Sequence, residues 1–368
     1  MSTHLAIAAA IALGCAAPFG RSAAPCGTDA TLVLRGLDPV ELVDGREVEG
    51  AEELAADHGG FRYRFISEDT RELFLADPER YGVQWDGACG RMGPLSGIGD
   101  ADRFAVWNER IWLFASDQCR TGFLKAPEKL QPIDEAPPAA DDAAKAAGQA
   151  LLEQAAAALG DLQALDQLKG VQIHQLLKTT SAGTDWHGTR DVWFAFPDSY
   201  RFEEAWSGKG YGHAIAGTTA TRFEPNARQV LGKVSTTAVQ REAARHPLWI
   251  VKNRRQLLAV PAGQDTVLGQ PALLVTVHHA GQNVTLALDA KSSRVVELRH
   301  TGHASRGVAP VVRRVTAWQP VGKLRLPARI QTVGVDGVVD DTVVGCESTS
   351  GTSVTTDPAF EAGHFGGR

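Results

Sequence analysis

One segment of the chain occurs twice. Residues 65–81 read FISEDTRELFLADPERY, and residues 114–130, which begin 49 residues later, read FASDQCRTGFLKAPEKL. An internal repeat identifies the building unit of a fold, so it constrains the structure more than composition does. The shared positions are Phe65, Ser67, Arg71, Phe74, Leu75, Pro78 and Glu79, which return as Phe114, Ser116, Arg120, Phe123, Leu124, Pro127 and Glu128.

Each copy predicts a strand, a short capped helix and a proline stop. Aromatic and charged residues alternate before Ser67, as in a strand, and Ser67 is a good helix N-cap. Pro78 then ends the helix. Ser116 and Pro127 take the same places in the second copy, where Cys119 replaces Thr70. Only the second copy therefore carries a thiol in the helix.

The chain divides into several regions. Its 368 residues exceed one small domain. Residues 30–131 form the repeat-containing module, residues 132–148 are a linker rich in Pro, Ala and Asp, and residues 149–362 form a second domain. That domain opens with apolar residues at helical spacing from Leu151 to Leu168.

The second domain is otherwise predicted to be almost entirely β. Residues 239–260 lack alternation and suggest a helical or loop insert. One helix followed by a long antiparallel meander indicates a half-barrel sheet wrapped on helices, so the whole chain is α+β. The predicted strands are Val171–Leu177, Val192–Phe196, Thr219–Phe223, Gln229–Val234, Ala272–His278, Val284–Leu288, Val295–His300, Val311–Trp318 and Arg329–Val333.

The first 25 residues are typical of an export signal, which places the protein in the periplasm or cell envelope. The apolar run Leu5–Leu13 is too short to span a bilayer. Cys15 follows it in a context similar to a bacterial lipobox, which predicts lipidation there; cleavage near Ala23-Ala24 is the alternative. A lipid on Cys15 is the only membrane attachment that we expect.

Charge argues against nucleic-acid binding, because the formal net charge is −6. The first module is the acidic part, with 19 acidic residues against 12 Lys plus Arg over residues 30–131. Export would expose the cysteines to an oxidising compartment. Apart from Cys15, the four cysteines Cys26, Cys89, Cys119 and Cys346 allow three disulfide pairings.

The first module resembles the YHS domain, on the segments Asp38-Pro39-Val40, Tyr63–Ser67, Asp77–Tyr81 and Gly87-Ala88-Cys89. Glu41, Ile66 and Thr70 stand where the metal-binding branch of that family has cysteines. The second copy keeps thiols, because residues 86–92 imitate the family's opening motif and Cys119 lies in the turn.

Cys89, Cys119 and Met92 would form a soft ligand set, suited to copper and less well to zinc. A Cys89–Cys119 disulfide in a structural or interaction module is the alternative, and a thiol redox accessory is a third reading.

The second domain resembles the LolA/LolB-like lipoprotein carriers. The segments that carry this resemblance are Ala158–Asp161, Leu168–Gly170, Phe196–Arg201, Val284–Asp289, Arg294–Val296 and Leu324–Ile330. The resemblance implies a lipid or acyl ligand held between sheet and helices. Trp193, Trp206, Trp249 and Trp318 are candidates to line that cavity, although such residues more often pack in cores.

Other constellations favour binding rather than catalysis. His278 and His279 are adjacent, so in a strand they point to opposite faces, and together with His300 and His303 they are predicted to be surface histidines. The sequence contains no nucleophile elbow, P-loop or zinc-protease motif. We therefore expect a non-enzymatic binding protein.

Overall fold

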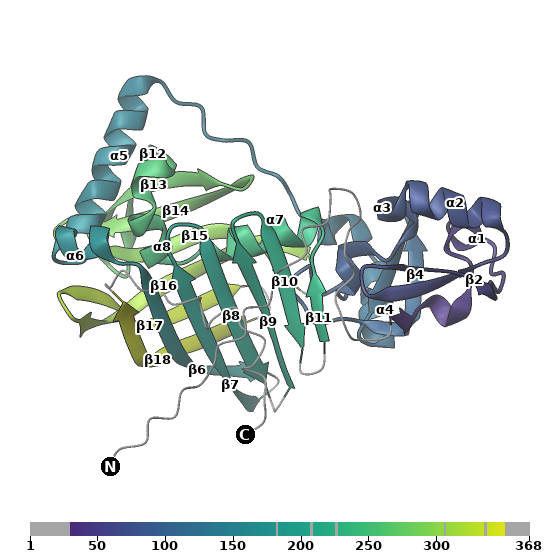
Figure 1. Ribbon diagram of the computed structural model, residues 1–368. Helices are drawn as coiled ribbons and strands as arrows, with labels where there is room; N and C mark the ends of the chain where they lie inside the picture. The colour runs from purple at the N-terminus through teal and green to yellow at the C-terminus, as the bar shows by residue number, and fades with distance from the viewer. Residues whose placement is uncertain are drawn as a thin grey trace, which may run out of the picture.

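The computed structural model describes residues 30–181, 183–206, 209–224, 227–304, 307–334 and 337–349. The predicted signal segment, which includes Cys15, lies outside them, and so does Cys26. The chain forms a small first module and a large sheet wrapped on helices (Figure 1). The module lies beside β10 (Thr219–Glu224) and β11 (Ala227–Val230) at one end of the sheet. Within the described residues, no helix combines the length and apolar character needed to cross a membrane.

The repeat folds twice in the same way. In the first copy, β3 (Phe61–Phe65) leads into α2 (Glu68–Ala76), and the Ser67 hydroxyl accepts a hydrogen bond from the N–H of Thr70. In the second, β5 (Arg110–Phe114) leads into α4 (Asp117–Leu124), capped by Ser116. The predicted strand and capped helix are confirmed in both copies.

Two small sheets complete the first module. They have the strand orders β1-β3-β2 and β4-β5. Each proline stop also starts a further turn, because proline suits the first position of a helix. The other elements are β1 (Thr31–Leu32), η1 (Leu34–Gly36), α1 (Pro39–Val43), β2 (Ala51–His58), α3 (Pro78–Tyr81), η2 (Gln84–Gly87), β4 (Asp100–Trp107) and η3 (Pro127–Leu130).

An extended segment connects the module to α5 (Asp142–Ala157), which stands at the opposite end of the large sheet (Figure 1). The helix begins inside the segment expected to be linker, because Asp141 caps it by accepting from the N–H of Ala144. Gly148 lets α5 approach the sheet, since a Cβ there would collide with the carbonyl of Ala259. Helix α6 (Leu162–Gln167) follows.

The large sheet has thirteen strands in the order β11-β10-β9-β8-β7-β6-β18-β17-β16-β15-β14-β13-β12. Its neighbours are antiparallel, as predicted. The strands are β6 (Gly170–Ser181), β7 (Thr184–Ala195), β8 (Ser199–Trp206), β9 (Lys209–Ala216), β10 (Thr219–Glu224), β11 (Ala227–Val230), β12 (Leu258–Val267), β13 (Gln270–His279), β14 (Gln282–Asp289), β15 (Val295–Ala304), β16 (Gly307–Val321), β17 (Leu324–Gly334) and β18 (Gly337–Thr349).

Each predicted strand overlaps an observed one, but Gln229–Val234 is wrong at its end. Strand β11 stops at Val230, and α7 (Lys233–Ala243) begins three residues later, with Gly232 at the N-cap position. Helix α8 (Pro247–Lys252) and η4 (Arg254–Gln256) fill the predicted insert. Four strands of the large sheet were not predicted, namely β8, β9, β12 and β18. The strand signal is weak in β12, which contains a proline, and in β9, which is rich in glycine.

The sheet's inner face, defined as the face that packs against α5–α8, holds the main core. Leu152 of α5, Val239 of α7 and Ile250 of α8 are buried there against strand residues such as Val192 and Phe202. Because side chains alternate along a strand, Arg190 and Glu204 lie on this same inner face, two positions from Val192 and Phe202. This placement puts charged groups inside the half-barrel.

Candidate functional site

A buried arginine joins the first module to the large sheet. Arg222 of β10 is 1% exposed, and its guanidinium donates to the carbonyls of Asp86 at 2.8 Å, Trp85 at 3.3 Å and Pro94 at 3.2 Å. It also donates to Gln229 at 3.1 Å. Since a guanidinium stays charged and offers five donors, it suits several carbonyls at once. Arg222 therefore holds the second copy of the repeat against the sheet.

Further hydrogen bonds extend this contact. The N–H of Ile98 donates to Glu224 at 2.7 Å, and the N–H of Gly232 donates to Asp86 at 2.9 Å. His303 of β15 lies 3.0 Å from the carbonyl of Arg91 through its Nε2. The first copy contributes the carbonyl of Gly59, which accepts from the Gln229 amide at 2.6 Å. Docking therefore rests mainly on the second copy.

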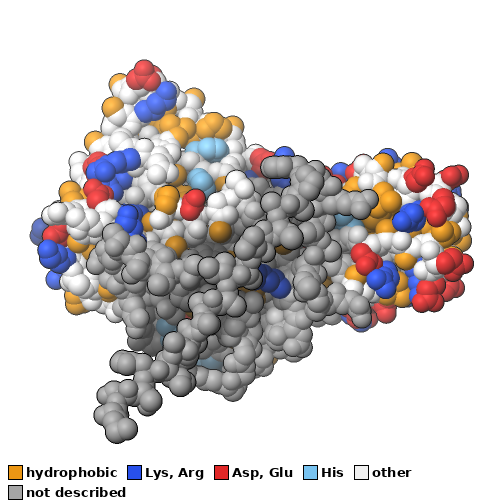
Figure 2. Space-filling model, in the orientation of Figure 1, with side chains coloured by type: hydrophobic (Ala, Val, Ile, Leu, Met, Phe, Trp, Pro, Cys, Tyr) orange, Lys and Arg blue, Asp and Glu red, His pale blue; other side chains and the backbone are white. Residues whose placement is uncertain are grey.

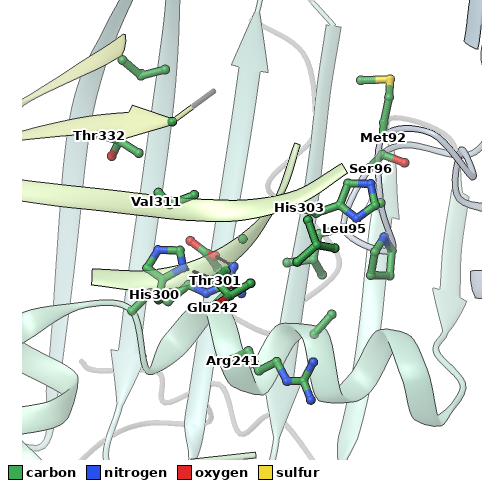
Figure 3. A pocket seen from close by; sticks show the side chains of 18 of the residues that line it. Met92, Leu95, Ser96, Arg241, Glu242, His300, Thr301, His303, Val311 and Thr332 are labelled. Atoms are coloured by element: carbon green, nitrogen blue, oxygen red, sulfur yellow. Dashed lines mark hydrogen bonds and ion pairs between the residues drawn. The ribbon is translucent and has the colours of Figure 1, made fainter. Parts of the chain in front are cut away.

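A cavity of about 450 Å³ lies between the inner face, helix α7 and the second copy. The loop Met92–Gly97 forms its wall on the module side (Figure 3). Helix α7 contributes Arg241 and Glu242, and Arg245 follows the end of this helix. Strands β6–β9 and β14–β18, with Pro132 and Ile133 of the linker, form the rest. The first module is thus part of the cavity and not a separate appendage.

Charged side chains gather on one side of this cavity. Arg313 donates to Glu242 at 2.7 Å, and Arg245 donates to the same carboxylate at 3.0 Å. Burial alone would raise the pKa of Glu242, but the two guanidiniums outweigh it and hold that pKa far below its usual value. Glu242 therefore stays ionised at neutral pH.

A second buried cluster lies beside the first. Arg190 forms an ion pair with Glu204 and another with Asp341, the latter at 3.3 Å. Asp341 is 3% exposed, and burial raises the pKa of its carboxyl. The Oδ1 atom of Asp341 has no partner among the described residues. Asp341 is thus a buried carboxyl whose charged form is disfavoured by its surroundings.

Apolar side chains also line the cavity. Pro94 and Leu95 come from the module loop, and Val308 and Val311 come from β16, where Val311 pairs across the strands with His300. Leu95 also packs against the main core. The cavity therefore offers both charged groups and apolar surface.

None of the four predicted tryptophans lines this cavity. Trp193 lies on the outer face beneath the Arg201 guanidinium, because it alternates with the buried Val192 and Phe194. Trp206 donates to Glu204, and Trp318 packs at the edge of the main core.

Trp249 instead lines a second cavity of about 330 Å³, between α7, α8 and the sheet. It lies there against His279, with ring centroids 4.8 Å apart.

The prediction of surface histidines is wrong for His300, which is 6% exposed and lines the larger cavity. Its position on the inner face, opposite Val311, explains the burial. His303 lies edge-on to Trp85 in the contact between module and sheet. His278 and His279 are half-buried on β13, which β14 separates from β15.

The sequence did not point to the charged residues of the cavity. Arg190, Glu204 and Arg313 occupy polar positions of alternating strands, which ordinarily face solvent. A signal was present, because each lies two residues from an apolar residue that is buried or lines the cavity, namely Val192, Phe202 and Val311. Charged and apolar residues in the same phase of a strand indicate a polar patch inside the fold.

No protein-family model matches the chain, and no curated protein does. Solved structures that it resembles include a DUF1329 family protein from Desulfovibrio piger, with 10% identity and a TM-score of 0.43, covering 60% of this chain and 99% of that one. Another is a LolA superfamily protein from Nitrosomonas europaea, with 10% identity and a TM-score of 0.39, covering 54% and 92%. The function of the chain has to come from its own geometry.

The two predicted thiols meet at the strand–helix turn of the second copy. Cys89 is fully buried, and its Sγ accepts from the N–H of Ala115 at 3.4 Å. Cys119 packs into the same apolar cluster and interacts electrostatically with Cys89. Both are free thiols, and burial raises the pKa of Cys89.

The first copy has an acid and a hydroxyl in the same place. Asp38 accepts from the N–H of Ile66 at 2.8 Å and from the Thr70 hydroxyl at 2.7 Å. Ile66 and Thr70 return as Ala115 and Cys119, so Cys89 corresponds to Asp38. The sequence interpretation aligned residues 86–92 with the family's opening motif, which puts Asp86 at the position of Asp38, and this alignment is wrong by three residues.

The donors that the structure brings together do not fit a closed zinc site. Among the described residues, no three His, Cys, Asp or Glu side chains gather as metal ligands. Met92 is 56% exposed and lines the large cavity. Two thiols fall short of the four N or S ligands that structural zinc requires.

Proposed function

We propose that the protein is an exported, non-enzymatic binding protein that holds a lipid-like ligand in the half-barrel. The observation that carries this proposal is the 450 Å³ cavity between the inner face, α7 and the module loop. Its size falls in the range typical of small-molecule sites. Its apolar side, with Leu95, Val308 and Val311, suits a hydrocarbon chain, and each buried CH₂ group contributes about 0.8 kcal/mol.

The polar side of the cavity suits binding better than catalysis. Glu242 is held by Arg313 and Arg245, and Arg190 by Glu204 and Asp341. Because two guanidiniums hold the pKa of Glu242 far below its usual value, this carboxylate is a poor proton acceptor near neutral pH. The cluster therefore supplies fixed charge, which can orient a ligand.

Two neighbouring valines provide the test. Val311 faces the cavity, and Val312 faces the outer surface of the same strand. We expect V311F to weaken binding of the neutral fluorescent probe N-phenyl-1-naphthylamine, because the added ring fills the cavity. V312F should bind the probe as the wild-type protein does. Equal probe affinity in all three proteins would contradict the proposal.

A second candidate function concerns the thiols, and the correspondence between Cys89 and Asp38 favours it. Because Asp38 and Thr70 are in direct contact, the shared scaffold also brings Cys89 and Cys119 together. We propose that a Cys89–Cys119 disulfide forms after export and fixes the second copy. Such a bond typically stabilises a small domain by about 2–4 kcal/mol.

Mass spectrometry of the oxidised, alkylated protein tests this second candidate. The expected result is a crosslinked peptide pair containing Cys89 and Cys119, with no alkylation at either. Two alkylated thiols after oxidation would contradict it. If anaerobically purified protein contains copper in proportion to its thiols, the soft-metal reading replaces the disulfide.

A further inference from the structure

Four guanidiniums line the large cavity, and Arg241 pairs with Asp134, which leaves those of Arg190, Arg245 and Arg313 to build its polar side. They face the carboxylates of Glu204 and Glu242 at the cavity, with Asp341 buried behind them. Figure 3 shows Glu242 and His300 close together on this side, with Leu95 across the cavity. The cavity thus presents charged groups for the polar end of an amphipathic molecule and apolar side chains for its other end.

The balance of charge in this cluster depends on Asp341. Three positive groups face three carboxyls when all are ionised. Glu242 is firmly ionised, whereas burial raises the pKa of Asp341. A proton on Asp341 leaves one positive charge in excess. Because a buried unpaired charge is costly, the cluster would then favour an anion beside it.

Two polar atoms on this side also lack partners among the described residues. Arg313 uses its terminal nitrogens for Glu242 and for the carbonyl of Arg245, but its Nε–H has no acceptor. His300, which is 6% exposed, contacts the carbonyl of Thr301 through Nδ1 and has no partner for Nε2. Both residues lie on the inner face of the adjacent strands β15 and β16.

We infer that this side of the cavity binds the acidic head group, a carboxylate or a phosphate, of an amphipathic ligand, with Arg313 as the main recognition residue. The inference rests on the proposed function and adds the class of ligand. An oxyanion would accept from the Arg313 Nε–H and offset the positive charge. The alkyl chain would lie against Leu95, Val308 and Val311.

Three ligands with one chain length test the inference: laurate, dodecyl phosphate and dodecanol, each titrated into the full chain. We expect laurate or dodecyl phosphate to bind at least about tenfold more tightly than dodecanol, as a charge-assisted hydrogen bond would provide. The tighter of the two acids shows whether the site is built for a carboxylate or a phosphate.

Adjacent arginines give a matched pair of variants. R313Q should lose the preference for the acids and keep the affinity for dodecanol. R314Q removes the same charge on the outer face, where Arg314 pairs with Glu297 at 2.8 Å, and should keep the preference. Because R313Q leaves Glu242 less well paired, R313K serves as a second variant that keeps the charge but lacks the Nε–H. It should show a weakened preference for the acids.

The outcomes distinguish a failure of the head-group inference from a failure of the proposed function. If both acids bind no more tightly than dodecanol, the head-group inference is overturned while the lipid-like cavity stands. The same holds if R313Q and R313K fold and retain the full preference for the acids. If none of the three ligands binds, and V311F matches the wild-type protein toward the neutral probe, the proposed function fails and the inference fails with it.

Discussion

The two copies of the repeat share a scaffold down to their backbone conformation. Leu34-Arg35-Gly36 opens the first copy with three left-handed residues, and Trp85-Asp86-Gly87 opens the second in the same way. An antiparallel bridge follows in each, Leu37 with Glu49 and Ala88 with Ile98. The side chain after the bridge then turns onto the strand–helix junction, as Asp38 in one copy and Cys89 in the other.

The copies differ in what connects the two sides of that bridge. The first copy contains helix α1, which Asp38 caps by accepting from the N–H groups of Val40 and Glu41. The second copy has the loop Met92–Gly97 in this region, and that loop lines the cavity. Acidic side chains gather at the end of the first module away from the sheet (Figure 2). Duplication thus produced one copy with a self-contained helix and one that serves the large sheet.

The largest expected effect comes from separating the second copy from the sheet. R222A removes the donor shared by the carbonyls of Trp85, Asp86 and Pro94 and leaves them buried without it. We expect a loss on the order of 4 kcal/mol in the free energy of unfolding. Calorimetry should show two separate transitions where the wild-type protein has one.

R228A is the control for this change. Arg228 is exposed on the neighbouring strand β11, so its removal should leave the melting profile nearly unchanged. A single, unshifted transition in R222A would show that the module does not depend on this arginine for docking.

The next prediction compares the loss of Asp38 with the loss of Cys89, the two buried side chains at the strand–helix turns. D38A removes an acceptor for three backbone N–H groups and the Thr70 hydroxyl, so we expect a loss of about 3 kcal/mol. C89A removes one weak sulfur acceptor and should cost about 1 kcal/mol under reducing conditions. Urea unfolding of both variants measures the difference. Equal losses would indicate that Asp38 is not the structural centre of its copy.

Much of this fold was predictable from sequence, because it depends on local signals. Ser67 and Ser116 cap helices as expected, and alternation located most strands of the large sheet. The docking of the second copy was not predictable, since Arg222 acts through backbone carbonyls that no sequence pattern marks. The match of Cys89 to Asp38 was missed because the loops between them and the shared strands differ in length.

Acid should affect the half-barrel more than the first module. Burial lowers the pKa of His246 to about 3, and it also lowers the pKa values of His213 and His300. The unfolded chain protonates these groups near pH 6.5, so it binds more protons than the folded chain at lower pH, and stability falls as pH falls. His246 alone should cost about 2 kcal/mol at pH 5.

Hydrogen exchange read by mass spectrometry at pH 7 and pH 5, after correction for the intrinsic rates, resolves the two parts. Peptides from β7–β10 and α7 should lose protection at pH 5 more than peptides from β3 and α2. If the first module and the half-barrel lose protection equally at pH 5, the acid sensitivity does not originate in the half-barrel.

The last prediction is read by crosslinking and not by stability, and it tests the correspondence of the copies directly. The double variant D38C/T70C in a C89A/C119A background transfers the thiol pair to the first copy. Because Asp38 and Thr70 are in contact, the new cysteines should crosslink under oxidation. Single substitutions D38C or T70C in that background supply the control. A double variant that remains fully alkylated would show that the two turns are not equivalent.

A crystal structure of the full chain grown with dodecyl phosphate tests the central claim most directly. The account predicts the phosphate within hydrogen-bond distance of Arg313 and the alkyl chain between Val311 and Leu95, so that both the sheet and the second copy contact the ligand. Dodecyl phosphate bound outside this cavity, or a cavity closed by the side chains of Val311 and Leu95, would contradict it.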